Sequence, residues 1–248
     1  MPVTRSDYLT TARSLLNENH SKAKCAFIAG SVVRGEQTAT SDIDTVIVYD
    51  TDDLPKAYRH SIVYQNWPIE MFVQNLNSLS YFWKQDIACG MPVLITMIAE
   101  GIIIPDGNEY ARSLQSKARD VLAAGPAKLS TEEIDNRRYA LTDLLDDMEG
   151  PKNTAELYGT LSVLYQKLGD FYLRANRCWS GNSKSLTRAI KKAFPDLADK
   201  YEAAFKSAFA GDTRPLSELA DTLLQPFGGR YWSGLKSYAP NEANQTEK

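Results

Sequence analysis

The sequence predicts an α+β protein with a mixed sheet in its N-terminal half and an antiparallel helix bundle in its C-terminal half. Two observations carry this prediction. Short apolar runs typical of strands occur before residue 105, whereas beyond residue 130 apolar residues recur only at helical spacing. Gly and Pro interrupt both patterns at Ala124-Gly125-Pro126-Ala127. We therefore expect one domain over residues 1–125, a second over 126–240 and a disordered polar tail over 241–248.

The elements of the first domain follow the spacing of its apolar residues. A helix capped by Thr4 or Ser6 is expected first, and Gly30 is expected to allow a sharp turn into a short helix. In chain order we predict a helix from residue 8 that ends near residues 17–19, a strand over 24–29, a short helix over 31–35, a strand over 43–49, a strand over 61–64, a turn over 65–68, a strand over 69–73, helices over 79–87 and 91–98, a strand over 102–104 and a helix over 109–123.

The second domain contains only helical patterns. Ser130 and Glu133 have the spacing of a capping box, which predicts the start of its first helix. Short breaks between the apolar patterns favour antiparallel neighbours, as in a helix bundle. The expected helices cover residues 130–148, 154–176, 183–193, 196–210 and 213–225.

The composition is that of a globular chain without a strong charge bias. Hydrophobic residues make up 43% of the 248 residues, charged residues make up 24%, and the formal net charge is −3. A nucleic-acid-binding chain usually has an excess of Lys and Arg, so a polynucleotide partner is not expected. No run of about 18 apolar residues predicts a membrane span. Residues 1–5 lack the apolar centre of a signal peptide, so the expected compartment is the cytoplasm.

Acidic residues in two of the expected strands carry the functional prediction. Asp42 and Asp44 stand at i and i+2, so in a strand both side chains project from one face. Adjacent carboxylates repel each other unless a cation lies between them, and Mg²⁺ prefers oxygen ligands shared with substrate phosphates. Glu70 alternates with apolar Ile69 and Met71. If its strand lies beside the strand of the two aspartates, Glu70 can join them.

These residues resemble the signature of a known superfamily. Gly30-Ser31, ten further residues and then Asp42-x-Asp44 resembles the pattern of nucleotidyltransferases with the polymerase-beta-like fold, and Glu70 stands where that superfamily has its third acid. A mixed N-terminal half followed by a helical C-terminal half is similar to the aminoglycoside nucleotidyltransferases of the streptomycin and spectinomycin adenylyltransferase type.

The resemblance implies an activity and a set of ligands. It implies transfer of AMP from ATP to a hydroxyl of a small acceptor, such as an aminoglycoside antibiotic, with release of pyrophosphate. Asp42, Asp44 and Glu70 would be the catalytic residues and would bind Mg²⁺, with two ions expected. Glu70 would act as the general base in the resembled group, and an acid of the helical domain is the alternative.

Four residues are expected to contact the nucleotide. Gly30 lets the backbone approach a phosphate, and Ser31 would begin a helix whose N-terminal amides favour anions. Arg34 could reach the triphosphate or could instead pair with Asp42 or Glu36. Lys184 would be a cation in the first turn of a helix, where it opposes the helix dipole. It is similar to a phosphate-binding lysine of the resembled group, and a plain surface lysine is the alternative.

The helical domain offers candidates for the acceptor site. Asp146 and Asp147, together with Asp143, form an acidic stripe at i, i+3 and i+4. Such a stripe could bind a cationic substrate, or it could be a solvated helix face that pairs with Arg137 and Arg138.

The role of Trp179 is open, and so are two alternative functions. Trp179 would either line an interdomain cleft or pack within the bundle. An enzyme that attaches AMP to a protein would use the same chemistry with a different acceptor. A non-catalytic nucleotide sensor would bind ATP and Mg²⁺ without turnover. The sequence predicts no oligomeric state.

Overall fold

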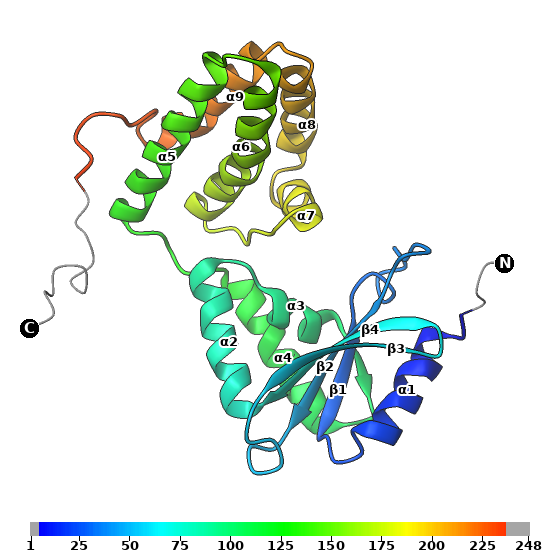
Figure 1. The fold of residues 1–248 in the computed structure, drawn as a ribbon. Coiled ribbons are helices and arrows are strands. Elements are labelled where there is room, and N and C mark those ends of the chain that lie inside the picture. The colour runs from blue at the N-terminus through cyan, green and yellow to red at the C-terminus, as the bar shows by residue number, and fades with distance from the viewer. Residues whose placement is uncertain (1–4, 237–248) are drawn as a thin grey trace, which may run out of the picture. The chain divides into compact units, whose positions relative to one another are not determined.

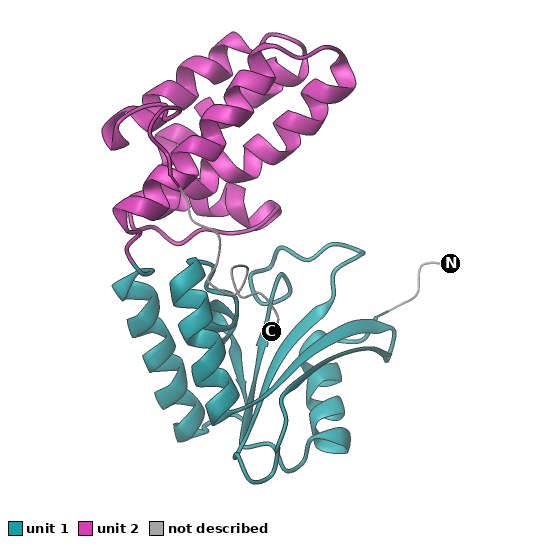
Figure 2. Ribbon diagram, turned by 60° about the vertical axis from the view of Figure 1, so that its left-hand side comes forward, with its two compact units in different colours: residues 1–127 teal, residues 128–248 magenta. Residues whose placement is uncertain are grey.

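The computed structural model of the protein describes residues 5–236 (Figure 1). The chain divides into two compact units, residues 1–127 and 128–248 (Figure 2). The predicted α+β class is confirmed, because the first unit contains a mixed sheet and the described part of the second contains helices but no strand. The predicted tail over 241–248 and the proposed cap Thr4 lie outside the described residues. No described helix has the length and apolar character needed to cross a bilayer.

A five-stranded sheet forms the centre of the N-terminal unit. Its strand order is β3-β4-β2-β1-β5. Strands β2 and β4 pair in parallel, and each of the other neighbouring pairs is antiparallel. The strands are β1 (Cys25–Ala29), β2 (Ile43–Tyr49), β3 (Tyr58–Tyr64), β4 (Trp67–Asn75) and β5 (Ile102–Ile104).

Helices cover both faces of this sheet. Helix α1 (Tyr8–Asn19) packs on one face, where Leu15 shares a core with Ile43, Ile47 and Met71. Helix α2 (Leu76–Cys89) contacts β4, and α3 (Val93–Glu100) contacts β1 and β2, while α4 (Glu109–Ala124) packs against α3 (Figure 1). Side chains alternate between the faces of a strand. The even-numbered residues of β2 and β4 therefore lie on the face opposite α1.

Two local predictions, the cap of α1 and the turn after β3, are wrong. The cap of α1 is Asp7, whose carboxylate accepts from the Thr10 amide at 2.9 Å, whereas the Ser6 hydroxyl is bonded to Thr11 Oγ1 at 2.6 Å. The predicted turn over 65–68 is shorter, because Trp67 already belongs to β4. The reversal is made by Gln65 and Asn66 alone, with φ of 47° and 66°. A two-residue hairpin turn of this kind needs both residues in the left-handed region.

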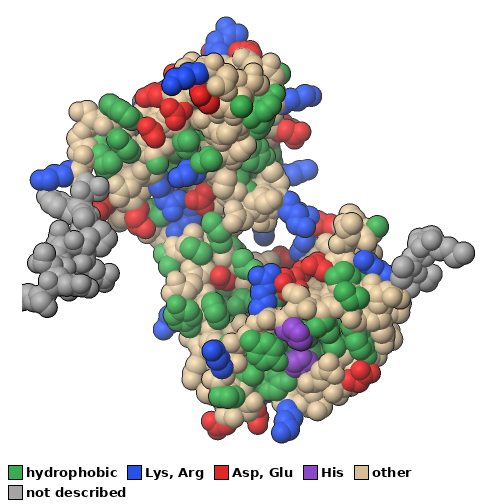
Figure 3. Space-filling model, viewed as in Figure 1, with side chains coloured by type: hydrophobic (Ala, Val, Ile, Leu, Met, Phe, Trp, Pro, Cys, Tyr) green, Lys and Arg blue, Asp and Glu red, His purple; other side chains and the backbone are tan. Residues whose placement is uncertain are grey.

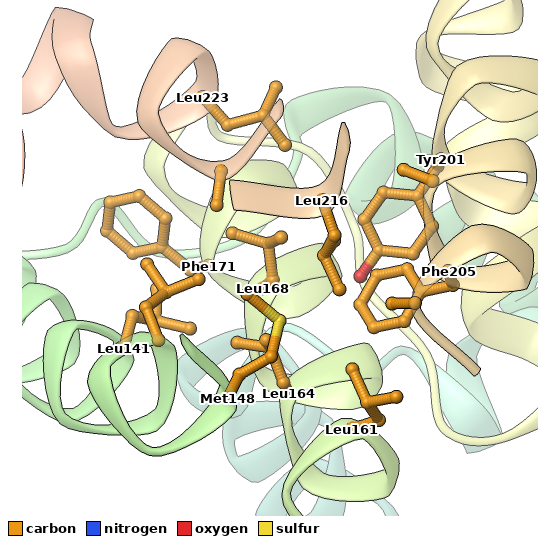
Figure 4. Close-up of a cluster of buried hydrophobic side chains, with 14 of the residues drawn as sticks. Leu141, Met148, Leu161, Leu164, Leu168, Phe171, Tyr201, Phe205, Leu216 and Leu223 are labelled. Carbon is orange, nitrogen blue, oxygen red and sulfur yellow. The ribbon is translucent and has the colours of Figure 1, made fainter. Parts of the chain in front are cut away.

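The C-terminal unit is built of helices around one apolar core. Figure 4 shows Leu141 on α5, Leu164, Leu168 and Phe171 on α6, and Tyr201 on α8 converging in this core. The predicted capping box is present, since the Glu133 amide donates to Ser130 Oγ at 3.1 Å and the Ser130 amide donates to Glu133 Oε2 at 2.7 Å. The helices are α5 (Thr131–Glu149), α6 (Thr154–Ala175), α7 (Lys184–Ala193), α8 (Pro195–Phe209) and α9 (Arg214–Leu224), followed by a short 3₁₀ turn, η1 (Gln225–Phe227).

Candidate active site

Three carboxylates meet at one end of the sheet. Asp42 directly precedes β2, Asp44 is the second residue of β2, and Glu70 lies in β4. Because β2 and β4 are parallel neighbours, Asp44 and Glu70 are directly paired across the ladder. One carboxylate oxygen from each of the three residues lies within 4.8 Å of the others. The condition for Glu70 to join the two aspartates, that its strand lie beside theirs, is therefore met.

The donor set fits a hard divalent cation. All three groups are carboxylates, and Mg²⁺ prefers oxygen ligands over nitrogen or sulfur. Asp42 is exposed while Asp44 and Glu70 are partly buried, so a bound ion would keep access to solvent and to a substrate. Figure 3 shows acidic side chains gathered beside basic ones on the N-terminal unit. Three carboxylates this close repel one another, and a cation would relieve that repulsion.

Gly30 lies against the carboxylate of Asp44. It follows β1 directly, and its neighbour Ala29 is paired with Asp44 in the β1–β2 ladder. The φ of Gly30 is +84°, and a Cβ atom placed on it would lie 2.2 Å from Asp44 Oδ2. A side chain at this position would therefore meet both an unfavourable backbone conformation and a steric clash. Glycine is needed here to keep the carboxylate of Asp44 in place.

The predicted helix over 31–35 is wrong, because these residues form a turn. The Glu36 amide donates to the Ser31 carbonyl at 3.0 Å, and Gly35, with φ of +68°, ends the turn after five residues. The Ser31 hydroxyl donates to Ser41 Oγ at 3.1 Å, which ties the turn to the far end of its loop. Ser31 therefore does not begin a helix, and the expected anion site at a helix N-terminus is absent there. The Ser31 hydroxyl, next to Gly30, is the polar group that this position offers.

Arg34 pairs with one of the partners considered from the sequence. Its Nε donates to Glu36 Oε2 at 3.0 Å, and the side chains of Arg34 and Glu36 are 35% and 43% exposed. Exposed ion pairs of this kind contribute only about 0–1 kcal/mol. The pair therefore holds the Arg34 side chain only weakly.

Arg59 holds Glu70, a contact that the sequence patterns did not indicate. Arg59 Nε donates to Glu70 Oε1 at 2.7 Å, and the Ser61 hydroxyl donates to the same oxygen at 3.2 Å. The bond from Arg59 lowers the pKa of Glu70 below its ordinary value, against the opposing effect of burial. Glu70 is therefore ionised at neutral pH. The apolar pattern predicts a strand from Ser61, but β3 begins at Tyr58, and its alternation places Arg59 and Ser61 on the face of Glu70.

Four predicted residues belong to the C-terminal unit. Lys184 is the exposed first residue of α7, and Trp179 is half-buried in the segment between α6 and α7. Asp146 and Asp147 are exposed on α5. Arg230 Nη1 lies 3.4 Å from Asp146 Oδ1, so the acidic stripe has a basic neighbour that the sequence did not suggest.

The expected pairing of the acidic stripe with Arg137 and Arg138 is wrong. Arg137 binds Asp170, and Arg138 binds Asp135 at 2.7 Å. Arg138 is only 8% exposed, because it shares the inward face of α5 with Leu141, whereas the acids of the stripe face solvent. The two arginines and the stripe therefore lie on different faces of the helix.

Comparison with known proteins supports one superfamily. Residues 10–82 match the model of a family described as a nucleotidyltransferase domain, and this range includes Gly30, Asp42, Asp44 and Glu70. A search among curated proteins returned no match. Among solved structures, a nucleotidyltransferase-like protein from Exiguobacterium sibiricum 255-15 is similar at 13% identity and a TM-score of 0.45, over 88% of this chain and 74% of that one. The family match and the acidic triad within it support the nucleotidyltransferase superfamily and a nucleotidyl transfer activity.

Proposed function

We propose that the protein is a Mg²⁺-dependent nucleotidyltransferase that transfers AMP from ATP to a hydroxyl of a small acceptor and releases pyrophosphate. The observation that carries this proposal is the convergence of Asp42, Asp44 and Glu70 within 4.8 Å, inside the range that matches the nucleotidyltransferase domain. An aminoglycoside is the first acceptor to test, on the resemblance to the streptomycin and spectinomycin type.

Asp42, Asp44 and Glu70 would hold the metal, with two ions in the proposed enzyme. When bound, Mg²⁺ offsets the charge of the phosphates and polarises the phosphoryl oxygens. The protein contributes by holding the three carboxylates in place before the metal and the substrate bind. Asp44 and Glu70 lie on paired strands whose other face is buried, so their positions follow from the sheet. A preorganised site of this kind needs little rearrangement when the substrate binds.

Gly30, Ser31 and Arg34 are proposed to receive the triphosphate. Gly30 has no side chain to displace the Asp44 carboxylate that lies against it, and the hydroxyl of Ser31 can exchange its bond to Ser41 for a phosphate oxygen. Arg34 belongs to the same loop, and its guanidinium is proposed to bind the triphosphate. Lys184 is proposed as a further phosphate contact on the strength of the resemblance.

Glu70 is proposed to accept the proton of the attacking hydroxyl. The bond from Arg59 keeps Glu70 ionised, so the proton-accepting form is present at neutral pH. For the acceptor, we retain Asp146, Asp147 and Trp179 of the C-terminal unit as proposed contacts, again on the resemblance.

The proposal is tested by following pyrophosphate release with Mg²⁺, each of the four nucleoside triphosphates and a panel of hydroxyl-bearing acceptors that includes streptomycin and spectinomycin. Asp42→Asn and Asp44→Asn should each lower the rate by about 10²-fold or more, because each removes a charge from the site. Asp52→Asn, in the exposed turn after β2, is the matched control and should keep the rate.

Three outcomes would change the assignment. A normal rate in either aspartate variant would contradict the metal site. ATP and Mg²⁺ binding without turnover on any acceptor would favour a nucleotide sensor. Appearance of AMP on a co-expressed protein, read by mass spectrometry, would favour a protein acceptor.

A further inference from the structure

A pocket of about 360 Å³ lies in the N-terminal unit between the sheet and two helices. Strands β3 and β4 contribute one side of its lining, and helices α2 and α3 contribute the other. Its volume is in the range of small-molecule sites, which are mostly apolar and carry a few polar groups. None of the residues that the sequence indicated as functional lines this pocket, so it is a separate feature of the same unit.

Asp86 of α2 is the acidic residue of this lining. Its Oδ2 accepts from the amides of Leu94 and Ile95 at 3.0 Å and 3.4 Å. These amides belong to the first turn of α3, whose own N-cap, Pro92, makes no side-chain bond, so Oδ2 caps α3 from the neighbouring helix. The cap explains one carboxylate oxygen. An uncharged Asn caps a helix about as well, so the cap does not explain the negative charge.

The second carboxylate oxygen of Asp86 is accessible to a ligand. Oδ1 has no hydrogen-bond partner among the residues that the structure describes, and it is not one of the fully buried atoms that lack a partner. Oδ1 therefore keeps accessible surface, and the space beside Asp86 that can hold a molecule is this pocket. Gln74 Oε1 in the same lining is fully buried, so a ligand cannot reach it. Asp86 Oδ1 is the acceptor that the pocket can offer.

The charge of Asp86 is not balanced by a basic side chain. Arg59, the basic residue of the lining, is bonded to Glu70 at 2.7 Å. Burial raises the pKa of Asp86 to about 6 from 3.8, and only the two backbone bonds oppose this effect. Keeping this carboxylate ionised at neutral pH therefore costs folding free energy. A ligand with a positive charge would supply the missing partner and reduce that cost.

Aromatic side chains share the lining with this acid. Tyr58, Phe72 and Phe82 all line the pocket, and Tyr58 and Phe82 are 44% and 40% exposed. Cations are attracted to the faces of aromatic rings, and aromatic cages recognise alkylated ammonium groups. The guanidinium of Arg59 already lies 5.0 Å from the centre of the Phe72 ring. A primary ammonium has three donors to satisfy, whereas a tertiary or quaternary ammonium has one or none. The apolar lining therefore favours an alkylated ammonium.

We propose that this pocket binds a small organic cation, a tertiary or quaternary ammonium group, with its positive charge beside Asp86 Oδ1 and its alkyl groups against Tyr58 and Phe82. The site goes beyond the proposed function. None of the three carboxylates of the candidate active site lines the pocket, so binding of the cation requires neither ATP nor Mg²⁺.

The test uses two ligands that differ in charge and needs no turnover. Choline carries a quaternary ammonium group, and 3,3-dimethylbutan-1-ol has a carbon atom in place of the nitrogen, with nearly the same shape and no charge. Binding of each to the full chain is measured by ligand-detected NMR. We expect choline to bind roughly fivefold more tightly or better than the alcohol. Asp86→Asn, which keeps an oxygen able to cap α3 but removes the charge, should abolish this difference.

Two further variants control for the fold and for net charge. Phe82→Ala should weaken both ligands about fivefold because both lose apolar contact, and since Phe82 is 40% exposed the variant should still fold. Asp120→Asn removes one negative charge from an exposed position of α4 outside the lining of the pocket. It should leave both affinities unchanged.

The outcomes distinguish this site from the proposed function. Failure of choline to bind, equal affinities for the two ligands in the wild type, or no effect of Asp86→Asn on choline would overturn the inference. Loss of choline binding in Asp44→Asn, with binding retained in Asp86→Asn, would place the cation at the three carboxylates and also overturn it. Choline binding that depends on Asp86, without nucleotidyl transfer to any acceptor, would uphold the ammonium site while refuting the transferase.

Discussion

Gly30→Ala should disable the carboxylate site while leaving the fold intact. A Cβ at residue 30 would lie 2.2 Å from Asp44 Oδ2, and Cβ atoms essentially never approach a heavy atom closer than 3.0 Å. The carboxylate must therefore move by at least 3.0 − 2.2 = 0.8 Å. A displacement of about 1 Å in a reacting group can cost about 10²-fold in rate. We expect a loss of that size for nucleotidyl transfer.

Gly35→Ala provides a matched control within the same loop. Gly35 also has a positive φ, +68° against +84° at Gly30, but no atom lies within 4 Å of the Cβ that it would gain. Both variants should therefore lose the roughly 1–2 kcal/mol that a left-handed backbone costs a residue with a Cβ. Only Gly30→Ala displaces Asp44, so the difference between the two variants measures the clash alone.

The assay compares thermal unfolding with and without Mg²⁺ and the rate of pyrophosphate release. For a chain of this size each kcal/mol corresponds to roughly 2–4 °C in Tm, so both variants should lose several degrees, and Gly30→Ala should lose more because of its clash with Asp44. Mg²⁺ should raise the Tm of the wild type and of Gly35→Ala by mass action, but should do so much less for Gly30→Ala. The reasoning is refuted if Gly30→Ala keeps the rate and the Mg²⁺ response, or if Gly35→Ala loses as much of both.

Three further predictions follow from individual contacts. Burial raises the pKa of Asp86 to about 6 from 3.8, so the stability it contributes is complete below about pH 4 and is lost as the pH rises through 6. Asp86→Asn should therefore raise Tm above pH 6 and leave it unchanged near pH 4. Arg59→Met removes a positive charge from Glu70, so Mg²⁺ should bind several-fold more tightly by calorimetry, and weaker binding would contradict the geometry. Arg138→Met leaves the carbonyls of Gly228–Gly229 without their donor, and urea unfolding should show a loss of about 3 kcal/mol.

The spacing of Asp42 and Asp44 was sufficient to place both side chains on one face. In an extended chain alternate residues project to the same side, and this depends only on local sequence. The position of Glu70 depended on the parallel pairing of β2 with β4, which is a long-range contact. Arg59 could not be found in this way. Strand β3 is at the edge of the sheet and exposed through most of its length, so it lacks the apolar alternation that marks a strand. The apolar pattern therefore predicts a strand that begins three residues late and does not include Arg59.

Two errors arose from different causes. The helix expected at Ser31 failed because a left-handed glycine, Gly35, ends the turn before a second turn can form, and a single helical turn is unfavourable to nucleate. The pairing expected for Arg138 is wrong, although the apolar spacing of the sequence indicates where this residue lies. Arg138, Leu141 and Leu145 stand at i, i+3 and i+7, which places the arginine on the inward face of α5.

The two faces of the sheet explain why the carboxylates can be held so close together. Ile43 and Met71 are buried against α1, and the residues that follow Ile43 and precede Met71, Asp44 and Glu70, lie on the other face. A slip of β4 by one residue would exchange these faces and place Glu70 in the apolar core. The burial of Ile43 and Met71 therefore opposes any shift that would separate the acids. The packing of α1 against one face of the sheet therefore sets the carboxylate geometry on the other.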